Sequence, residues 1–178
     1  MFDIEELLRE YDRARAYTDQ LWRDLTGDEV LWRPHQESSA IGWHLGHQAH
    51  VAHFMVRNLT AAEPSPDPAL DALMDAATPE SERGFLPVPQ RLATFRTAVA
   101  ERVHARMNDI ADGRVGAPGQ LTIVAQHLLT ALINHEYQHD RWIGEVRNRD
   151  LGHALPPHPE SDKLTLVDGY LMVAPAAP

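Results

Sequence analysis

The sequence predicts an all-α fold, a four-helix bundle with a long crossover between helices 2 and 3 and a C-terminal tail, from three observations. Over four long stretches, apolar residues recur at spacings of three and four, as on the buried face of an amphipathic helix. Clusters of proline and glycine separate these stretches. The length of 178 residues, 43% of them hydrophobic and 24% charged, is typical of one globular domain. Four such helices pack most simply as a bundle.

A first helix is predicted over residues 3–25. Asp3 and Glu6 have the spacing of a capping box, in which each residue's side chain binds the other's backbone N–H. Residues 26–28 (Thr-Gly-Asp) are expected to end this helix. Pro34 is expected to keep the loop that follows this first helix free of helix.

A second helix is predicted to run from an N-cap at Ser38 or Ser39 to about Leu59. It carries four histidines at intervals of three residues, and these intervals spread them around much of the helix circumference. They cannot all point into the bundle, so only some of them are expected to have a function there. The four are His44, His47, His50 and His53.

The long crossover is predicted over residues 60–89, which contain six prolines and few apolar residues. Within it, a short helix is expected at 68–74 behind the cap Asp67. A third long helix is predicted over 89–112. The stretch 113–119, rich in glycine and proline, then separates it from the fourth.

The fourth helix is predicted over residues 121–150, and two histidines stand on its predicted apolar stripe. His135 and His139 are four residues apart, so they lie one above the other and their ring nitrogens can converge on one point. A buried imidazole needs a hydrogen-bond partner or a metal to offset its desolvation. The apolar members of the stripe are Leu121, Val124, Leu128, Ala131, Trp142 and Val146.

The tail is predicted to form a small β-hairpin, because Asp168-Gly169 separates two short apolar runs at 164–167 and 170–173. We therefore expect a bundle over residues 1–155 and a tail over 156–178. An isolated hairpin is marginally stable in water, so the tail should pack on the bundle or on a second subunit.

The composition limits the partners of this protein. The formal charge is −10 and no basic run occurs, so neither nucleic acid nor an anionic membrane is an expected partner. The N-terminus lacks the pattern of a signal peptide and no segment has transmembrane length, so a cytoplasmic location is expected. The absence of cysteine leaves His, Asp and Glu as the ligands of any transition-metal site.

One interpretation of the pattern His135-Glu136-x-x-His139 is a zinc protease, in which two histidines bind zinc and Glu136 is the general base. Such an enzyme needs a third ligand further along the chain. The candidates there do not follow the usual extended motifs, so this is the weaker interpretation. These candidates are Glu145, His153 and His158.

A stronger interpretation combines two segments that are far apart in the sequence. Ile41-Gly42-Trp43-His44-Leu45-Gly46-His47, together with His135-Glu136-Tyr137-Gln138-His139, resembles the DinB (DinB/YfiT-like) family of metal-binding four-helix bundles. It is most similar to the DinB_2 branch that includes the N-terminal domain of ergothioneine-forming sulfoxide synthases. The resemblance covers roughly the first 150 residues. It implies that His47, His135 and His139 hold one divalent metal, with His44 as the rival of His47.

For the other candidate residues, a structural role is the expected one. Glu136 should hydrogen-bond a ligand histidine or face another helix rather than act as a catalytic base. His50 and His53 should be exposed or lie behind the ligands, whereas His127 fits either role. Four aromatic residues should line the core or a pocket wall, and three residues of the first helix are within possible reach of the site. The aromatic residues are Trp43, Phe54, Tyr137 and Trp142. The residues of the first helix are Arg13, Tyr17 and Asp19.

The resemblance also implies an activity, because members of this family are thiol S-transferases that use low-molecular-weight thiols, or thiol-dependent isomerases. Three imidazoles leave positions open on a divalent transition metal, and Zn, Fe and Ni all accept such ligands. We therefore expect a metal-dependent enzyme that transfers a thiol to a small-molecule acceptor, and a homodimer. The alternatives are a hydrolase that activates water and a non-catalytic bundle braced by metal. The second domain of the sulfoxide synthases is missing here, so oxygen-dependent sulfoxide formation is not expected.

Overall fold

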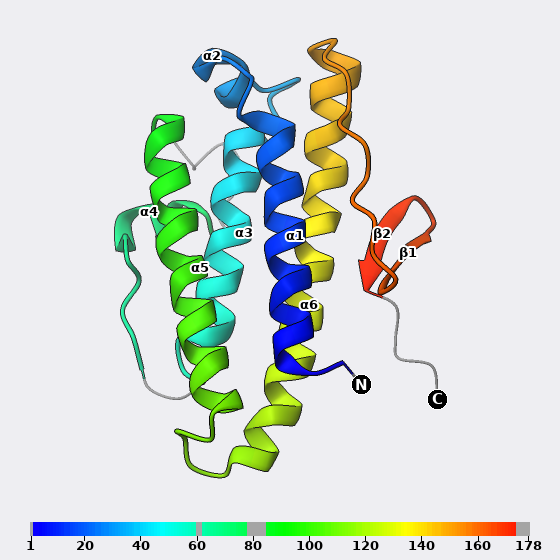
Figure 1. Cartoon of the computed structure of the whole chain (residues 1–178). Coiled ribbons are helices and arrows are strands. Elements are labelled where there is room, and N and C mark those ends of the chain that lie inside the picture. Colours follow the sequence, from blue (N-terminus) through cyan, green and yellow to red (C-terminus); the bar gives the residue numbers. More distant parts are fainter. Residues whose placement is uncertain (1, 60–61, 78–84, 174–178) are drawn as a thin grey trace.

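The computed structural model describes residues 2–59, 62–77 and 85–173, and four long helices pack as a bundle within this part (Figure 1). The predicted four-helix bundle is therefore confirmed. Its first helix packs mainly on the last, and the two middle helices pack on each other. The four helices are α1 (Ile4–Trp22), α3 (Ile41–Val56), α5 (Pro89–Ala111) and α6 (Pro118–Glu145).

Shorter elements complete the described part. A π-helical turn over Val146–Asp150 continues α6, so the helical path ends where the sequence predicted. Two short helices flank α3 along the chain, and two strands follow α6. They are α2 (Gly27–Leu31), α4 (Pro68–Leu73), β1 (Leu164–Val167) and β2 (Tyr170–Val173). None of the helices described is both long and apolar enough to cross a bilayer.

The start of α1 is the predicted capping box. The Asp3 carboxylate accepts a hydrogen bond from the Glu6 N–H at 2.7 Å, and the Glu6 carboxylate accepts one from the Asp3 N–H at 3.0 Å. The loop before Pro34 was predicted to contain no helix, and this prediction is wrong. The short helix α2 begins in this loop, at a second capping box formed by Thr26 and Glu29. Proline restricts the residue directly before it, which leaves room for one helical turn earlier in the loop.

The predicted N-cap of α3 is also wrong. The helix begins after Ala40, which makes no side-chain capping hydrogen bond. The Ser38 hydroxyl instead accepts a hydrogen bond from the His35 N–H and donates one to the His35 carbonyl, both at 3.0 Å. A serine side chain can serve a local turn as well as a helix start, and here it serves the turn.

The crossover between α3 and α5 contains the predicted short helix. Asp67 caps α4 by accepting a hydrogen bond from the Leu70 N–H at 3.1 Å. Leu70 and Met74 are fully buried, so α4 is tied to the core although its flanks are rich in proline. Residues 60–61 and 78–84 of the predicted crossover lie outside the described part of the chain.

Gly46 is the point at which α3 and the end of α4 approach most closely. A Cβ atom on Gly46 would lie 2.8 Å from Met74 Cγ and closer still to the Met74 sulfur. Any side chain at position 46 would therefore push the residue after α4 away from α3.

We expect Gly46→Ala to lower the free energy of unfolding by about 1–3 kcal/mol, as overpacking of a tight contact does. Urea denaturation measures this change. Gly119→Ala is the matched control, since no atom lies within 4 Å of a Cβ built there, and it should be neutral or stabilising. Equal stability of the two variants would contradict the close contact.

The buried face of α6 is not the apolar stripe predicted from the sequence. Val124 is 44% exposed and Ala131 is exposed, whereas two carboxyl groups, Glu136 and Asp140, are buried. The core-facing side of α6 was missed because apolar periodicity takes no account of charged residues, and the fold buries two of them with partners. The buried residues of α6 are Ala125, Leu129, Leu132, Ile133, Glu136, Tyr137, His139, Asp140, Ile143 and Gly144, of which His139 stands on the predicted stripe.

The predicted tail hairpin is confirmed. β1 and β2 pair antiparallel, with Val167 opposite Tyr170, and the turn residues Asp168 and Gly169 have φ values of 51° and 82°. Two successive positive φ values are the signature of the type I′ turn that Asp-Gly favours. The hairpin packs on α6, and the Val173 N–H donates a hydrogen bond to Asn134 Oδ1 at 2.8 Å (Figure 1).

Candidate metal centre

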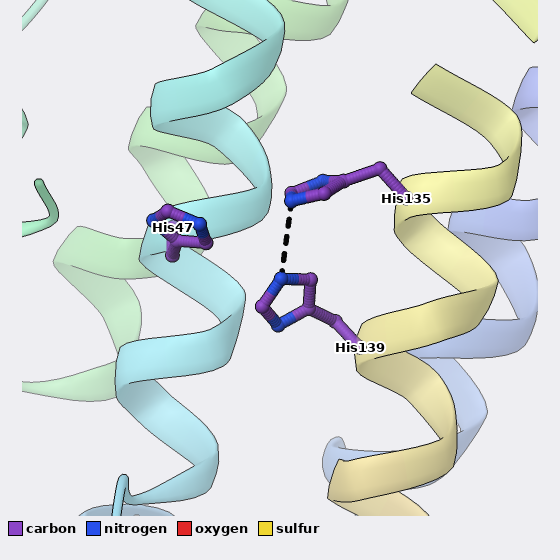
Figure 2. Close-up of side chains that lie close together, drawn as sticks. All are labelled: His47, His135 and His139. Carbon is purple, nitrogen blue, oxygen red and sulfur yellow. Dashed lines mark hydrogen bonds between the residues drawn. The ribbon is translucent and has the colours of Figure 1, made fainter. Parts of the chain in front are cut away.

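The bundle brings together the three histidines expected from the two motifs. His47 extends from α3, and His135 and His139 extend from α6 toward it (Figure 2). Each offers one ring nitrogen, and the three nitrogens lie within 4.8 Å of one another. His47 and His139 are buried, whereas His135 is half-buried. Three convergent imidazoles of this kind are placed to hold a single metal ion.

The spacing of two of these rings fits a shared cation. His135 Nε2 and His139 Nε2 are 3.1 Å apart, the contact drawn as a dashed line in Figure 2. Two nitrogens that each lie about 2.0–2.1 Å from one metal, at a tetrahedral angle, are about 3.3 Å apart. The observed distance is therefore close to the bound geometry, and the rings would need to move very little.

His47 is oriented by the end of α4. Its Nδ1 donates a hydrogen bond to the Met74 carbonyl at 2.7 Å, so the proton resides on Nδ1 and the lone pair on Nε2. Metal-binding histidines usually have such a partner on the nitrogen that does not bind the metal. Met74 thus contacts α3 twice, through its side chain at Gly46 and through its carbonyl at His47.

His44, the rival of His47, lies behind the cluster. Its Nδ1 is 2.8 Å from the Nδ1 of His139, the nitrogen that faces away from His135. This contact fixes the ring plane of His139 and leaves its Nε2 toward the other two histidines. His44 is thus placed as the partner of a cluster histidine, and the structure does not group it with the three.

We expect His44→Ala to weaken metal binding by about 10- to 100-fold, because His139 loses the partner that orients its ring. Competition with a chromophoric chelator measures the affinity. His127→Ala is the matched control, since His127 is an exposed histidine of α6, and it should bind metal as the wild type does. A complete loss of binding in His44→Ala would instead indicate that His44 is itself a ligand.

Burial lowers the pKa of the two cluster imidazoles of α6, His135 and His139. Desolvation is the largest cause that lowers the pKa of His135, to about 4, and Glu136 opposes it. Desolvation, followed by the neighbouring His44, also holds the pKa of His139 far below its usual range. A metal binds an imidazole through the lone pair of a ring nitrogen, so a lowered imidazole pKa favours metal binding.

Two indoles enclose the cluster. The Trp43 ring stacks on His47 with centroids 4.5 Å apart, and the Trp142 ring meets His139 edge-on at 4.9 Å. Trp43 and Tyr137 are buried as predicted. Phe54 is 58% exposed and not part of the core, with the Arg57 guanidinium 4.6 Å from its ring centroid, but it lines the wall of a cavity that also borders His47, which is one of its two expected roles.

The remaining histidines have partners outside the cluster. His50 Nδ1 pairs with Asp71 at 2.9 Å, and His53 is buried beside Arg102. The third ligands required by the zinc-protease interpretation lie elsewhere. His153 pairs with Glu29 at 2.7 Å, Glu145 pairs with Arg141 at 3.4 Å, and His158 meets Tyr17 edge-on.

Glu136 faces other helices, one of the two alternatives expected for it. Its carboxylate accepts hydrogen bonds at 3.2 Å from Arg96 of α5 and from Thr18 of α1. Arg96 also donates to Gln48 Oε1 at 2.6 Å, and Gln48 follows His47 directly in α3. The candidates of α1 do not reach the cluster: Arg13 bonds Glu10, Tyr17 packs on Tyr137, and Asp19 accepts from Trp22.

Asp140 completes this network as a second buried carboxyl group. Desolvation, and after it the nearby Glu136, raises the pKa of Asp140 well above its usual value. Thr18 Oγ1 lies 3.2 Å from Glu136, 2.7 Å from Asp140 and 3.2 Å from the Ala14 carbonyl, but it has one proton to donate. The hydroxyl can therefore donate to only one of these three oxygens at a time.

The network was missed in the sequence because each member looks like a surface residue. One signal was available, since Arg96 directly follows Phe95 and lies four residues after Leu92, two apolar residues at helical spacing that are buried in α5. A charged residue at such a position indicates a buried partner on a facing helix. Which partner it finds depends on packing.

Two cavities border the cluster on different sides. One, of about 690 Å³, is lined by His47 together with residues of α3, α4 and the crossover. The other, of about 510 Å³, is lined by His135 together with residues of α3, α6 and the hairpin. A molecule can therefore approach the histidines from either side.

A four-helix bundle whose second and fourth long helices bring three imidazoles together defines a helical protein with a candidate three-histidine metal centre. The chain belongs to the DinB superfamily, whose DinB_2 family model matches residues 10–143. The match confirms the family expected from the two histidine motifs, and both motifs lie inside it. A comparison with curated protein sequences gives no match.

Proposed function

We propose that this protein is a metal-dependent enzyme that activates a low-molecular-weight thiol and transfers its sulfur to a small-molecule acceptor. His47, His135 and His139 are the proposed ligands of one divalent transition metal: Zn, Fe or Ni. The observation that carries the proposal is the convergence of three imidazoles, two of them from the family's H-x-x-x-H pair, within 4.8 Å. The family to which the chain belongs supports the thiol chemistry.

The protein ligands suit a catalytic site. Three protein ligands leave at least one position on a tetrahedral cation for substrate, whereas purely structural zinc sites use four. A divalent cation held there would supply Lewis acidity, which lowers the pKa of a thiol bound to it. Trp43 and Trp142 exclude water from part of the cluster, and this strengthens electrostatic interactions inside it.

The cavity beside His47 suits the thiol. Its lining includes several charged residues among apolar ones: Arg57, Glu63, Asp75 and the His50–Asp71 pair. Low-molecular-weight thiols carry charged or polar groups, which such a lining can bind. His50, paired through Nδ1 with Asp71, is the proposed acceptor of the thiol proton.

The proposed reaction balances without a redox partner. The S–H bond of the thiol breaks, and its sulfur forms an S–C bond to the acceptor. The bond between that carbon and its leaving group breaks, and the leaving group takes the electron pair. The thiol proton passes through His50 to solvent or to the leaving group, which restores the starting protonation state.

The test is a screen of the purified, metal-containing protein with low-molecular-weight thiols and electrophiles. We expect turnover that requires both metal and thiol, and His50→Gln should slow it while metal content stays unchanged. Turnover without thiol would favour the hydrolase. Absence of turnover, with a large loss of melting temperature on metal removal, would favour a metal that only braces the bundle.

The homodimer expected from the sequence stays a proposal. Light scattering coupled to size-exclusion chromatography measures the mass directly, and a particle of one chain, 20.0 kDa, would contradict it.

A further inference from the structure

The cavity beside His135 differs in chemistry from the one beside His47. Its walls are formed by Met55 of α3, Ala131 of α6, and Tyr170, Leu171 and Met172 of β2. Among the described residues that line it, Asp168 is the one carboxylate, and it stands exposed in the hairpin turn. The amides of Asn134 and Gln138 add uncharged polar groups, so this lining differs from that of the cavity beside His47 mainly in having fewer charged residues.

The size and the side chains of this cavity fit a small organic molecule. Its volume of about 510 Å³ lies within the range of about 300–1,000 Å³ typical of ligand sites. Two of its wall residues are methionines, whose flexible thioethers adapt to apolar ligands of different shapes. Val167, also in the lining, is 45% exposed, so apolar surface is left open to solvent there.

The hairpin wall is held in place from α6. Arg141 donates a hydrogen bond to the Asp168 carbonyl at 3.3 Å, and its guanidinium lies over the Tyr170 ring, 4.6 Å from the centroid. The Val173 N–H is anchored on Asn134 at the other end of β2. A wall fixed at both ends is formed before any ligand binds, which lowers the entropic cost of binding.

We infer that the C-terminal hairpin completes the acceptor pocket and that the acceptor is an uncharged, largely apolar molecule. This inference rests on the proposed function, which places a thiol in the cavity beside His47 and leaves the second cavity for the other substrate. His135, a proposed metal ligand, borders the second cavity, so an acceptor there lies next to the cluster. The hairpin lies beyond the residues matched by the family model, so the acceptor pocket depends on a part of the chain outside that match.

Binding of the uncharged apolar dye Nile red, followed by its fluorescence, tests the pocket independently of activity. We expect wild-type protein to bind the dye. Met172→Asp places a carboxylate in the apolar wall and should weaken binding by about tenfold or more. Ala131→Phe fills the cavity from an exposed helix position that does not support the core, and it should weaken binding similarly.

Matched controls separate the cavity from the rest of the surface. Leu166→Asp makes the same kind of change on the hairpin outside the cavity, and Ala105→Phe makes the same change at an exposed position of α5. Both should bind the dye as the wild type does, and circular dichroism checks that all variants are folded. Wild-type protein that does not bind Nile red, or cavity variants that bind it unchanged, would overturn the inference.

A failure of the acceptor pocket can be distinguished from a failure of the proposed reaction. Dye binding that depends on the cavity, without any thiol transfer, would leave the pocket standing and refute the reaction. If transfer occurs, Ala131→Phe should raise KM for the acceptor, with KM for the thiol and metal content unchanged. Transfer that Ala131→Phe does not affect would refute the acceptor pocket and leave the reaction standing.

Discussion

Replacing His139 with alanine is expected to lower the affinity for a divalent metal by about 100-fold or more. Structural zinc sites with four ligands bind with about 10–16 kcal/mol, so one ligand accounts for roughly 3 kcal/mol, which is more than a 100-fold change. His139 is the central ring of the cluster, since it contacts His135 through Nε2 and His44 through Nδ1. Its loss removes a proposed ligand and the contact with His44.

The measurement is titration with Co²⁺, followed by visible absorption, together with metal analysis of the purified protein. His127→Ala, an exposed histidine of the same helix, is the control and should keep full binding. The expected order of affinity is His127→Ala, then His44→Ala, then His139→Ala. Retention of wild-type affinity in His139→Ala would show that the three histidines do not form the metal site.

Replacing Arg96 with methionine is expected to destabilise the fold by about 3–5 kcal/mol. Arg96 and Glu136 are both about 3% exposed, and their charged atoms are 3.2 Å apart in the middle of the bundle. Methionine removes the positive charge but leaves the Glu136 carboxylate buried, and it leaves Gln48 Oε1 without its shortest hydrogen bond. The cost comes mainly from these groups that lose their partner.

Arg91→Met on the same helix is the matched control. Arg91 also pairs with a carboxylate, that of Asp67 at 2.8 Å, but its side chain is 48% exposed. An exposed pair contributes only about 0–1 kcal/mol because water screens it. Urea denaturation compares the two variants, and an equally small effect of both would contradict a buried ion pair.

The double variant Arg96→Met/Glu136→Leu tests whether the unpaired Glu136 carboxylate causes the destabilisation expected of Arg96→Met. Removing both charges avoids an unpaired buried carboxylate, so we expect it to be more stable than Arg96→Met alone. A further loss of stability would show that the packing of these side chains, rather than their charge, holds the bundle together.

Much of the fold could be predicted because its signals are local. Asp3 and Glu6 start α1, Asp67 caps α4, and Asp168-Gly169 supplies the two residues with positive φ that a tight hairpin turn needs. Where a local signal had two uses, the prediction was wrong. Ser38 closes a turn with His35 instead of capping α3.

The sequence predicted which three histidines lie together but not which residues contact them. Two motifs and a family resemblance selected His47, His135 and His139, and the structure brings these three together. The sequence could not separate His44 from His47 by pattern alone, because both lie in one short motif. The contact between the Nδ1 atoms of His44 and His139 distinguishes their positions, and it depends on how α3 and α6 are rotated against each other.

The sequence by itself determined the four long helices, the tail hairpin and the residue types available for a metal, because periodicity, turn residues and the absence of cysteine are properties of the chain. Only the tertiary structure decided which face of α6 is buried, and it placed Glu136 and Asp140 there beside Arg96 and Thr18. The physical reason is that a charged side chain is buried only when a partner from another helix offsets its desolvation. Such partners are far apart in the sequence, so the packing of the bundle alone brings them together.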